Sequence, residues 1–168
     1  LRARLLRQSI SNEDEVVPLA REVEYAKGYL TIQKMRYKDK LEFEIDVEPS
    51  ILNIPLIKLV LQPIIENAIY HGLKYKESKG LLQVKGFMKD GNAVLQVIDN
   101  GVGMDEETLS HIYDKHKVNY HSNGVGVYNV QKRLKLYYGE NYGITYESEK
   151  GVGTTATITI PGIQEESI

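Results

Sequence analysis

The 168-residue sequence contains no cysteine, which excludes disulfides, thiolate nucleophiles and thiolate metal sites together and suits a reducing cytoplasm. It also lacks an excess of charge of either sign, because 21 basic and 23 acidic side chains leave a formal net charge of -2. No overall field therefore draws the chain to nucleic acid or to an anionic membrane. Any function must reside in local sites.

Long apolar runs and a signal peptide are missing as well. The most apolar stretch, 56–69, is interrupted by charged and amide side chains, whereas a membrane-spanning helix needs about 20 largely apolar residues. The chain starts at Leu1 in what reads as the middle of a helix, without a methionine or a leader sequence. We expect a fragment that folds as one globular domain and does not insert into a membrane.

Hydrophobic periodicity predicts a mixture of helices and strands. Leu41, Phe43, Ile45 and Val47 alternate with acidic residues, as in a half-buried strand. Asp90-Gly91 is typical of a hairpin between two strands. Apolar spacings of three and four predict helices elsewhere. The expected helices cover 16–40, about 53–74 and 125–138, and the expected strands cover 41–47, 81–88, 92–99, 144–148 and 154–160, with an irregular stretch over 100–123.

The predicted helix over 53–74 carries polar side chains on the rim of its apolar face. Asn67, His71 and Lys74 fall along one flank of that face. An asparagine offers a neutral carbonyl oxygen to a hard cation such as Mg²⁺, which takes further ligands from water and phosphate oxygens. Asn67 is therefore a candidate metal ligand, although capping of a neighbouring loop explains this motif equally well by itself.

The run Asp99-Asn100-Gly101-Val102-Gly103-Met104 directly follows a predicted strand. In an apolar neighbourhood, the Asp99 carboxylate can accept the exocyclic amine of adenine, and Gly101 and Gly103 let the backbone approach the ring. The alternative is an ordinary tight turn, because Asp-Asn-Gly is common in turns.

Two further glycine motifs occur near the C-terminal end. Gly124 and Gly126 open the last predicted helix, where free backbone amides and the positive end of the helix dipole suit a phosphate. They do not form a dinucleotide-binding fingerprint, because no strand precedes them and Asn129 replaces the last glycine. Thr154 follows the turn 151–153, where its hydroxyl can bond to a base or pair locally.

In this order, the four motifs resemble the nucleotide site of the GHKL superfamily of ATPases and kinases. Glu66-Asn67 resembles its N box, 99–103 its G1 box, 124–126 its G2 box and 151–155 its last glycine motif. More narrowly, the chain resembles the YesM/LytS-like branch of sensor histidine kinases. That likeness is carried by Leu61-Gln62-Pro63-Ile64-Ile65-Glu66-Asn67-Ala68-Ile69, Val17-Pro18-Leu19, Asn129-Val130-Gln131-Lys132-Arg133-Leu134 and Tyr138-Gly139.

The resemblance implies an α/β (α+β) two-layer sandwich of the Bergerat type, with helices on one face of a mixed, largely antiparallel sheet. The domain would cover 16–162, after the end of an upstream dimerisation and histidine-bearing segment or linker over 1–15 and before a tail over 163–168. ATP and Mg²⁺ are the implied cofactors, beneath a mobile lid over 105–123. The implied nucleotide-binding residues are Asn67, Tyr70, His71, Lys74, Asp99, Gly101, Gly103, Met104, Gly124, Gly126 and Thr154, with Asn67 also helping to hold Mg²⁺.

The resemblance also implies a protein-histidine kinase of a two-component phosphorelay. In hydrolytic members of the superfamily, a glutamate one turn before the asparagine activates water, and Pro63 stands at that position here. Proline cannot act as a base, so phosphoryl transfer is favoured over hydrolysis. None of the four histidines has the context of the family's phosphorylated histidine, so no catalytic residue is assigned and the acceptor is expected upstream of Leu1.

The implied partners are that upstream segment, in the same kinase or in its dimer mate, and a response regulator. The parent protein is expected in the bacterial cell membrane, with this domain on the cytoplasmic side. Glu66 points away from the apolar stripe in a helical projection, which favours an exposed or partner-facing role.

Other functions remain open on the residues alone. A serine kinase or another ATPase of the superfamily would share the nucleotide pocket, and a non-enzymatic interaction module would share its outline without binding ATP. The even spacing of His111, His116 and His121 suggests a metal site, but the segment supplies no cysteine or matched carboxylates. The 12 tyrosines and absent tryptophan are more typical of packing than of base stacking, so nucleic-acid binding is not expected.

Overall fold

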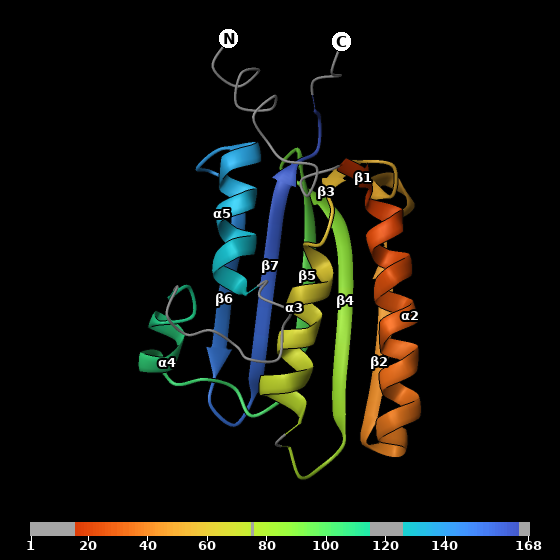
Figure 1. The fold of residues 1–168 in the computed structure, drawn as a ribbon, viewed down its shortest axis with the longest axis vertical. Coiled ribbons are helices and arrows are strands. Elements are labelled where there is room, and N and C mark those ends of the chain that lie inside the picture. Colours follow the sequence, from red (N-terminus) through yellow and green to blue (C-terminus); the bar gives the residue numbers. More distant parts are fainter. Residues whose placement is uncertain (1–15, 75, 115–125, 165–168) are drawn as a thin grey trace.

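The computed structural model describes residues 16–74, 76–114 and 126–164. In these ranges a layer of helices covers one face of a five-stranded sheet (Figure 1). The strand order is β2-β4-β5-β7-β6, with β2 parallel to β4 and all other neighbours antiparallel. The strands are β2 (Leu41–Val47), β4 (Gly80–Lys89), β5 (Asn92–Asp99), β6 (Gly143–Glu149) and β7 (Gly153–Pro161). The predicted mixed, largely antiparallel sandwich is confirmed.

Three helices lie on the same face of the sheet and bury their apolar stripes against it (Figure 1). They are α2 (Leu19–Tyr37), α3 (Leu61–Asn67) and α5 (Val127–Tyr138). Leu30 of α2, Ile64 of α3 and Leu134 of α5 are each at most 1% exposed. They pack with Leu95 and Ile158 of the central strands in one core. None of the described helices is long and apolar enough to cross a membrane.

The predicted helical start at about Asn53 was wrong. Pro55–Ile57 instead forms the short strand β3, which pairs antiparallel with β1 (Val16–Pro18). Strand β1 occupies the first three residues of the helix predicted over 16–40, so that helix begins only at Leu19. The 3₁₀ turn Pro49–Ile51 precedes β3, and another, Lys38–Lys40, ends the helical region of α2. Apolar residues at helical spacing could not reveal this pairing, because it depends on a partner strand about 40 residues away in the sequence.

The helix does not end with α3 but continues as a wider, π-helical turn. Residues Ala68–Leu73 form a π-helix, and the Lys74 backbone nitrogen donates to the Ile69 carbonyl oxygen at 2.9 Å. Single π-turns inside helices are frequent at functional sites. This turn carries two of the candidate site residues, His71 and Tyr70.

The stretch predicted as irregular contains a short helix, α4 (Glu106–Ser110), which lies beside β6 (Figure 1). Its N-terminus is capped by Asp105, whose carboxylate accepts a hydrogen bond from the Thr108 nitrogen at 2.8 Å. The rest of the predicted lid, with His116 and His121, lies outside the described residues, as do Gly124, residues 1–15 and most of the predicted tail.

Candidate functional site

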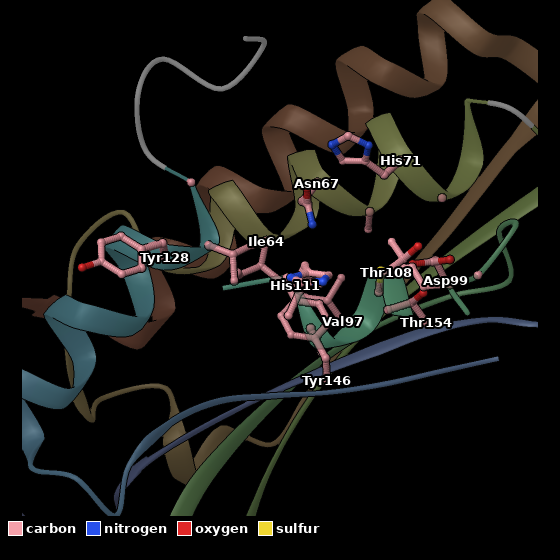
Figure 2. Close-up of a pocket in the computed structure, with 18 of the residues that line it drawn as sticks. Ile64, Asn67, His71, Val97, Asp99, Thr108, His111, Tyr128, Tyr146 and Thr154 are labelled. Atoms are coloured by element: carbon pink, nitrogen blue, oxygen red, sulfur yellow. The ribbon is translucent and has the colours of Figure 1, made fainter. Parts of the chain in front are cut away.

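A cavity of about 340 Å³ lies between the helix layer and the sheet. Its roof is α3 with the π-helical turn, and its floor is formed by β5, β6 and β7 (Figure 2). The segment 103–114 and the start of α5 close the sides. Its volume is typical of small-molecule sites, and its walls are largely apolar with a few polar groups. The predicted site residues among its lining are Asn67, His71, Asp99, Gly103, Met104, Gly126 and Thr154.

Asp99 is the principal buried charge in this cavity. It is the last residue of β5 and only 6% exposed, and the Gly101 nitrogen donates to its Oδ1 at 2.8 Å. Burial raises the pKa of Asp99 to about 6, while hydrogen bonds from the Gly101 and Thr154 amides and the charge of Lys76 act in the opposite direction. A carboxylate that is ionised at neutral pH in such a setting is a strong acceptor for an amino group of a ligand.

The turn that follows Asp99 is held by close backbone contacts. The Val102 nitrogen donates to the Gly72 carbonyl at 3.0 Å, and the Gly151 nitrogen donates to the Val102 carbonyl at 2.7 Å. A Cβ on Gly101 would overlap the Gly72 backbone, and one on Gly103, which has a φ of 67°, would overlap the Glu149 carbonyl. Gly101 therefore serves this packing and does not line the cavity, whereas Gly103 does both.

The helical roof presents Asn67 and His71, which lie one turn apart and both line the cavity (Figure 2). Tyr70 and Lys74 do not line it. The Tyr70 ring packs edge-on against the His71 ring with centroids 5.0 Å apart, and Lys74 Nζ lies 4.4 Å from the Tyr70 centroid. These two residues thus border the exposed His71 without reaching the cavity.

Glu66 also lies outside the cavity lining. Its carboxylate accepts a hydrogen bond from Gln62 Nε2 at 3.0 Å along the same helix. This placement agrees with the helical projection.

Several lining residues were missed from the sequence. Thr108, His111 and Asp114 come from the segment around α4, and His111 Nδ1 lies 2.7 Å from Asp114 Oδ2. The Tyr113 hydroxyl ties this segment to β6 by donating to the Ile144 carbonyl at 2.8 Å. The short α4 carries too few turns for a periodic signal, so the sequence offered little sign of it.

The residues of the cavity floor were also not predicted, although the alternation of their strands could have indicated them. Val97, Tyr146 and Ala156 point into the cavity from three adjacent strands. Alternation along each predicted strand could have placed them on the core face. Within the described ranges, no group of three or more histidine, cysteine or acidic residues is arranged to hold a metal ion.

Comparison with known proteins shows which families and folds this chain is similar to. Residues 53–164 match the family described as histidine kinase-, DNA gyrase B-, and HSP90-like ATPase, and residues 3–41 match the family described as histidine kinase. The chain is 32% identical to the sensor histidine kinase YesM of Bacillus subtilis, over 94% of this chain and 26% of that protein. It is 35% identical to the sensor protein LytS of Oceanobacillus iheyensis, over 76% of this chain and 22% of that protein.

The chain thus spans about a quarter of the length of these curated relatives. Among solved structures, the mycobacterial sensor histidine kinase MprB has a TM-score of 0.62 at 20% identity, covering 88% of this chain and 97% of that one. A catalytic domain of histidine kinase ThkA has a TM-score of 0.63 at 14% identity, covering 88% and 95%. At these identities the structural likeness concerns the fold alone.

Proposed function

Since the chain belongs to the histidine kinase-, DNA gyrase B- and HSP90-like ATPase family and is the catalytic domain of a two-component sensor histidine kinase, we propose that it holds ATP with Mg²⁺ in the cavity beneath α3. The γ-phosphoryl group is then transferred to a histidine on an upstream segment of the same kinase or of its dimer mate. A response regulator takes the phosphoryl group from that histidine.

The buried carboxylate of Asp99 is the observation that carries this proposal. It lies at one end of a largely apolar cavity, at the end of a strand, where it can accept the exocyclic amine of adenine. Thr154 pairs with Asp99 across β5 and β7 and lines the same end. Adenine bound there would direct its phosphates toward Asn67, His71 and the start of α5 at Gly126.

The residues present fit a magnesium ion that arrives with the nucleotide. Asn67 supplies one amide oxygen, and the described part of the cavity has no cluster of acidic side chains that would hold the ion alone. Mg²⁺ commonly keeps several waters and takes its other ligands from phosphate oxygens, so one protein ligand suffices. When bound, it neutralises the negative charge that resists phosphoryl transfer.

The residue one helical turn before Asn67 favours phosphoryl transfer over hydrolysis. Pro63 lies on α3 one turn before Asn67 and is buried, so no carboxylate stands there to activate water. Phosphoryl transfer then depends on a nucleophile brought in line with the γ-phosphate. In this proposal the nucleophile comes from outside residues 1–168, in a parent protein of the cell membrane whose catalytic domain faces the cytoplasm.

A phosphoryl-transfer assay tests this function. The chain is incubated with γ-labelled ATP, Mg²⁺ and a separate protein that carries the histidine-bearing segment of a YesM-like kinase, with Asp99→Asn as the inactive control. Acid-labile label is expected on the added segment and not on the chain itself. Acid-stable label on serine, rapid release of phosphate, or label on one of the chain's own histidines would contradict the proposal.

A further inference from the structure

The cavity floor contains a buried polar atom that the proposed function leaves without a role. The Tyr146 hydroxyl has essentially no solvent exposure and makes no hydrogen bond of ordinary geometry within the described residues. Leaving a buried hydroxyl unpaired costs free energy, and native structures seldom retain such groups without a reason. A phenylalanine would fill the same space without this cost, so the hydroxyl calls for an explanation.

The polar groups on either side of Tyr146 are already used by other partners. The Tyr113 hydroxyl donates to the Ile144 carbonyl at 2.8 Å, although the two tyrosine rings pack with centroids 6.1 Å apart. Gln131 is held through both ends of its amide by Ile144. Ser148, the next core-facing residue of β6, bonds to Gly153 and Thr154 and accepts from the Met104 nitrogen. None of these three side chains forms a hydrogen bond with the Tyr146 hydroxyl.

Asn67 is a further polar neighbour of Tyr146, and it lies across the cavity on the roof. The close-up shows the Asn67 amide directed downward into the cavity while Tyr146 rises from the floor (Figure 2). Burial raises the pKa of Tyr146, and the nearby Asn67 side chain acts in the opposite direction. The two side chains are therefore close enough to interact.

We propose that Tyr146 is a positioning residue for Asn67: its hydroxyl oxygen accepts a hydrogen bond from the Asn67 amide nitrogen and so directs the amide oxygen to the phosphates and metal ion of the bound nucleotide. This inference rests on the proposed function. An asparagine amide presents an oxygen from one orientation and an NH₂ group from the other. Only the first can coordinate a cation, so fixing the nitrogen on the cavity floor selects the orientation that binds the metal.

The variant Tyr146→Phe removes the hydroxyl and keeps the ring. Its affinity for a non-hydrolysable ATP analogue with Mg²⁺ should fall about three- to tenfold, the effect of one neutral hydrogen bond. Its affinity for ADP in the presence of a chelator should change less than about twofold, because the nucleoside contacts do not involve Asn67. Calorimetric titration gives both constants, and a cooperative melting transition shows that the variant is folded.

A double-mutant cycle with Asn67→Ala separates positioning from direct contact. If Tyr146 acts through Asn67, adding Tyr146→Phe to Asn67→Ala has no further effect on the affinity for the Mg²⁺ complex. The control Tyr29→Phe, on α2 and outside the cavity lining, should leave both affinities unchanged.

Three outcomes would overturn the inference: unchanged affinity of Tyr146→Phe for the Mg²⁺ complex, an equal loss for ADP without metal, or an undiminished effect in the Asn67→Ala background. Each of these is compatible with nucleotide binding by the wild-type chain and leaves the proposed function intact. Failure of the wild-type chain to bind any nucleotide would instead overturn the proposed function, and this inference with it.

Discussion

The carboxylate of Glu22 accepts a hydrogen bond from the backbone nitrogen of Val60 at 2.8 Å, across 38 residues of sequence. Glu22 lies on α2 and is 3% exposed. The amides of Leu59 and Leu61 also bond to it, and burial nevertheless raises its pKa. The side chain thus satisfies free amides at the start of α3 from another helix, in the place of a local capping residue.

Replacing this buried carboxylate should destabilise the domain. Glu22→Ala leaves the amides at the start of α3 without their acceptor, and the expected loss is about 2 kcal/mol of unfolding free energy. Glu24→Ala, on the exposed side of the same helix, should stay within about 0.5 kcal/mol of the wild type. Denaturant titration compares the two. Equal stability of the two variants would contradict the capping role.

This contact also explains what the sequence could and could not predict. The alternation of apolar and acidic residues over 41–47, and the Asp90-Gly91 turn, were sufficient to predict strands, because local pattern decides which face is buried. The start of α3 was not predictable in this way. Its amides are capped by Glu22, its preceding strand pairs with β1, and Leu59 has a positive φ of 61°, so long-range contacts overrule the local apolar spacing.

The same distinction between local pattern and long-range contact applies to the candidate site. Asp99, Asn67 and Thr154 could be predicted because they stand in short motifs next to predicted elements. Tyr146 and His111 could not be given a role, because their chemistry arises only when β6 and the α4 segment meet the cavity. Gly101 was predicted to let the backbone approach the base, but in the structure it does not line the cavity, and its missing side chain makes room for Gly72.

Two glycine-to-alanine variants should have opposite effects on stability. In Gly101→Ala the new Cβ meets the Gly72 backbone, which cannot move aside easily, and a loss of about 1–3 kcal/mol is expected. In Gly28→Ala the new Cβ meets nothing within 4 Å on the exposed side of α2, and a gain of about 0.5–1 kcal/mol is expected. Thermal melting tests both, and a stable Gly101→Ala protein would refute the close packing of the turn.

Asp99→Asn should weaken adenine nucleotides strongly. The change removes a charge-assisted hydrogen bond worth about 1.5–3 kcal/mol, so the ADP dissociation constant should rise roughly 10- to 100-fold. Asp90→Asn, in the exposed hairpin between β4 and β5, is the matched control and should bind ADP normally. Calorimetry measures both, and unchanged ADP affinity in a folded Asp99→Asn protein would exclude the adenine contact.

The raised pKa of Asp99 predicts two opposite pH dependences. Protonation below its pKa of about 6 removes the acceptor, so ADP affinity should fall about tenfold between pH 7 and pH 5. The free energy of unfolding without nucleotide changes with pH in the opposite direction. Because the pKa in the folded state lies above the ordinary value of 3.8, the buried carboxylate reduces stability as the pH rises from about 4 through 6.

These dependences are tested by comparing the wild type with Asp99→Asn. The variant should lose the Asp99-dependent part of both pH profiles, and its melting temperature without nucleotide should exceed that of the wild type most clearly above pH 7. Identical pH profiles of the two proteins would show that Asp99 does not titrate in this range.

The most direct test of nucleotide binding in this cavity is a calorimetric titration of the wild-type chain with a non-hydrolysable ATP analogue and Mg²⁺. We expect saturable binding at one site per chain, competition by ADP, and a loss of affinity of roughly 10- to 100-fold in Asp99→Asn. A folded chain that shows no saturable binding, or that binds the analogue equally well as Asp99→Asn, would contradict it.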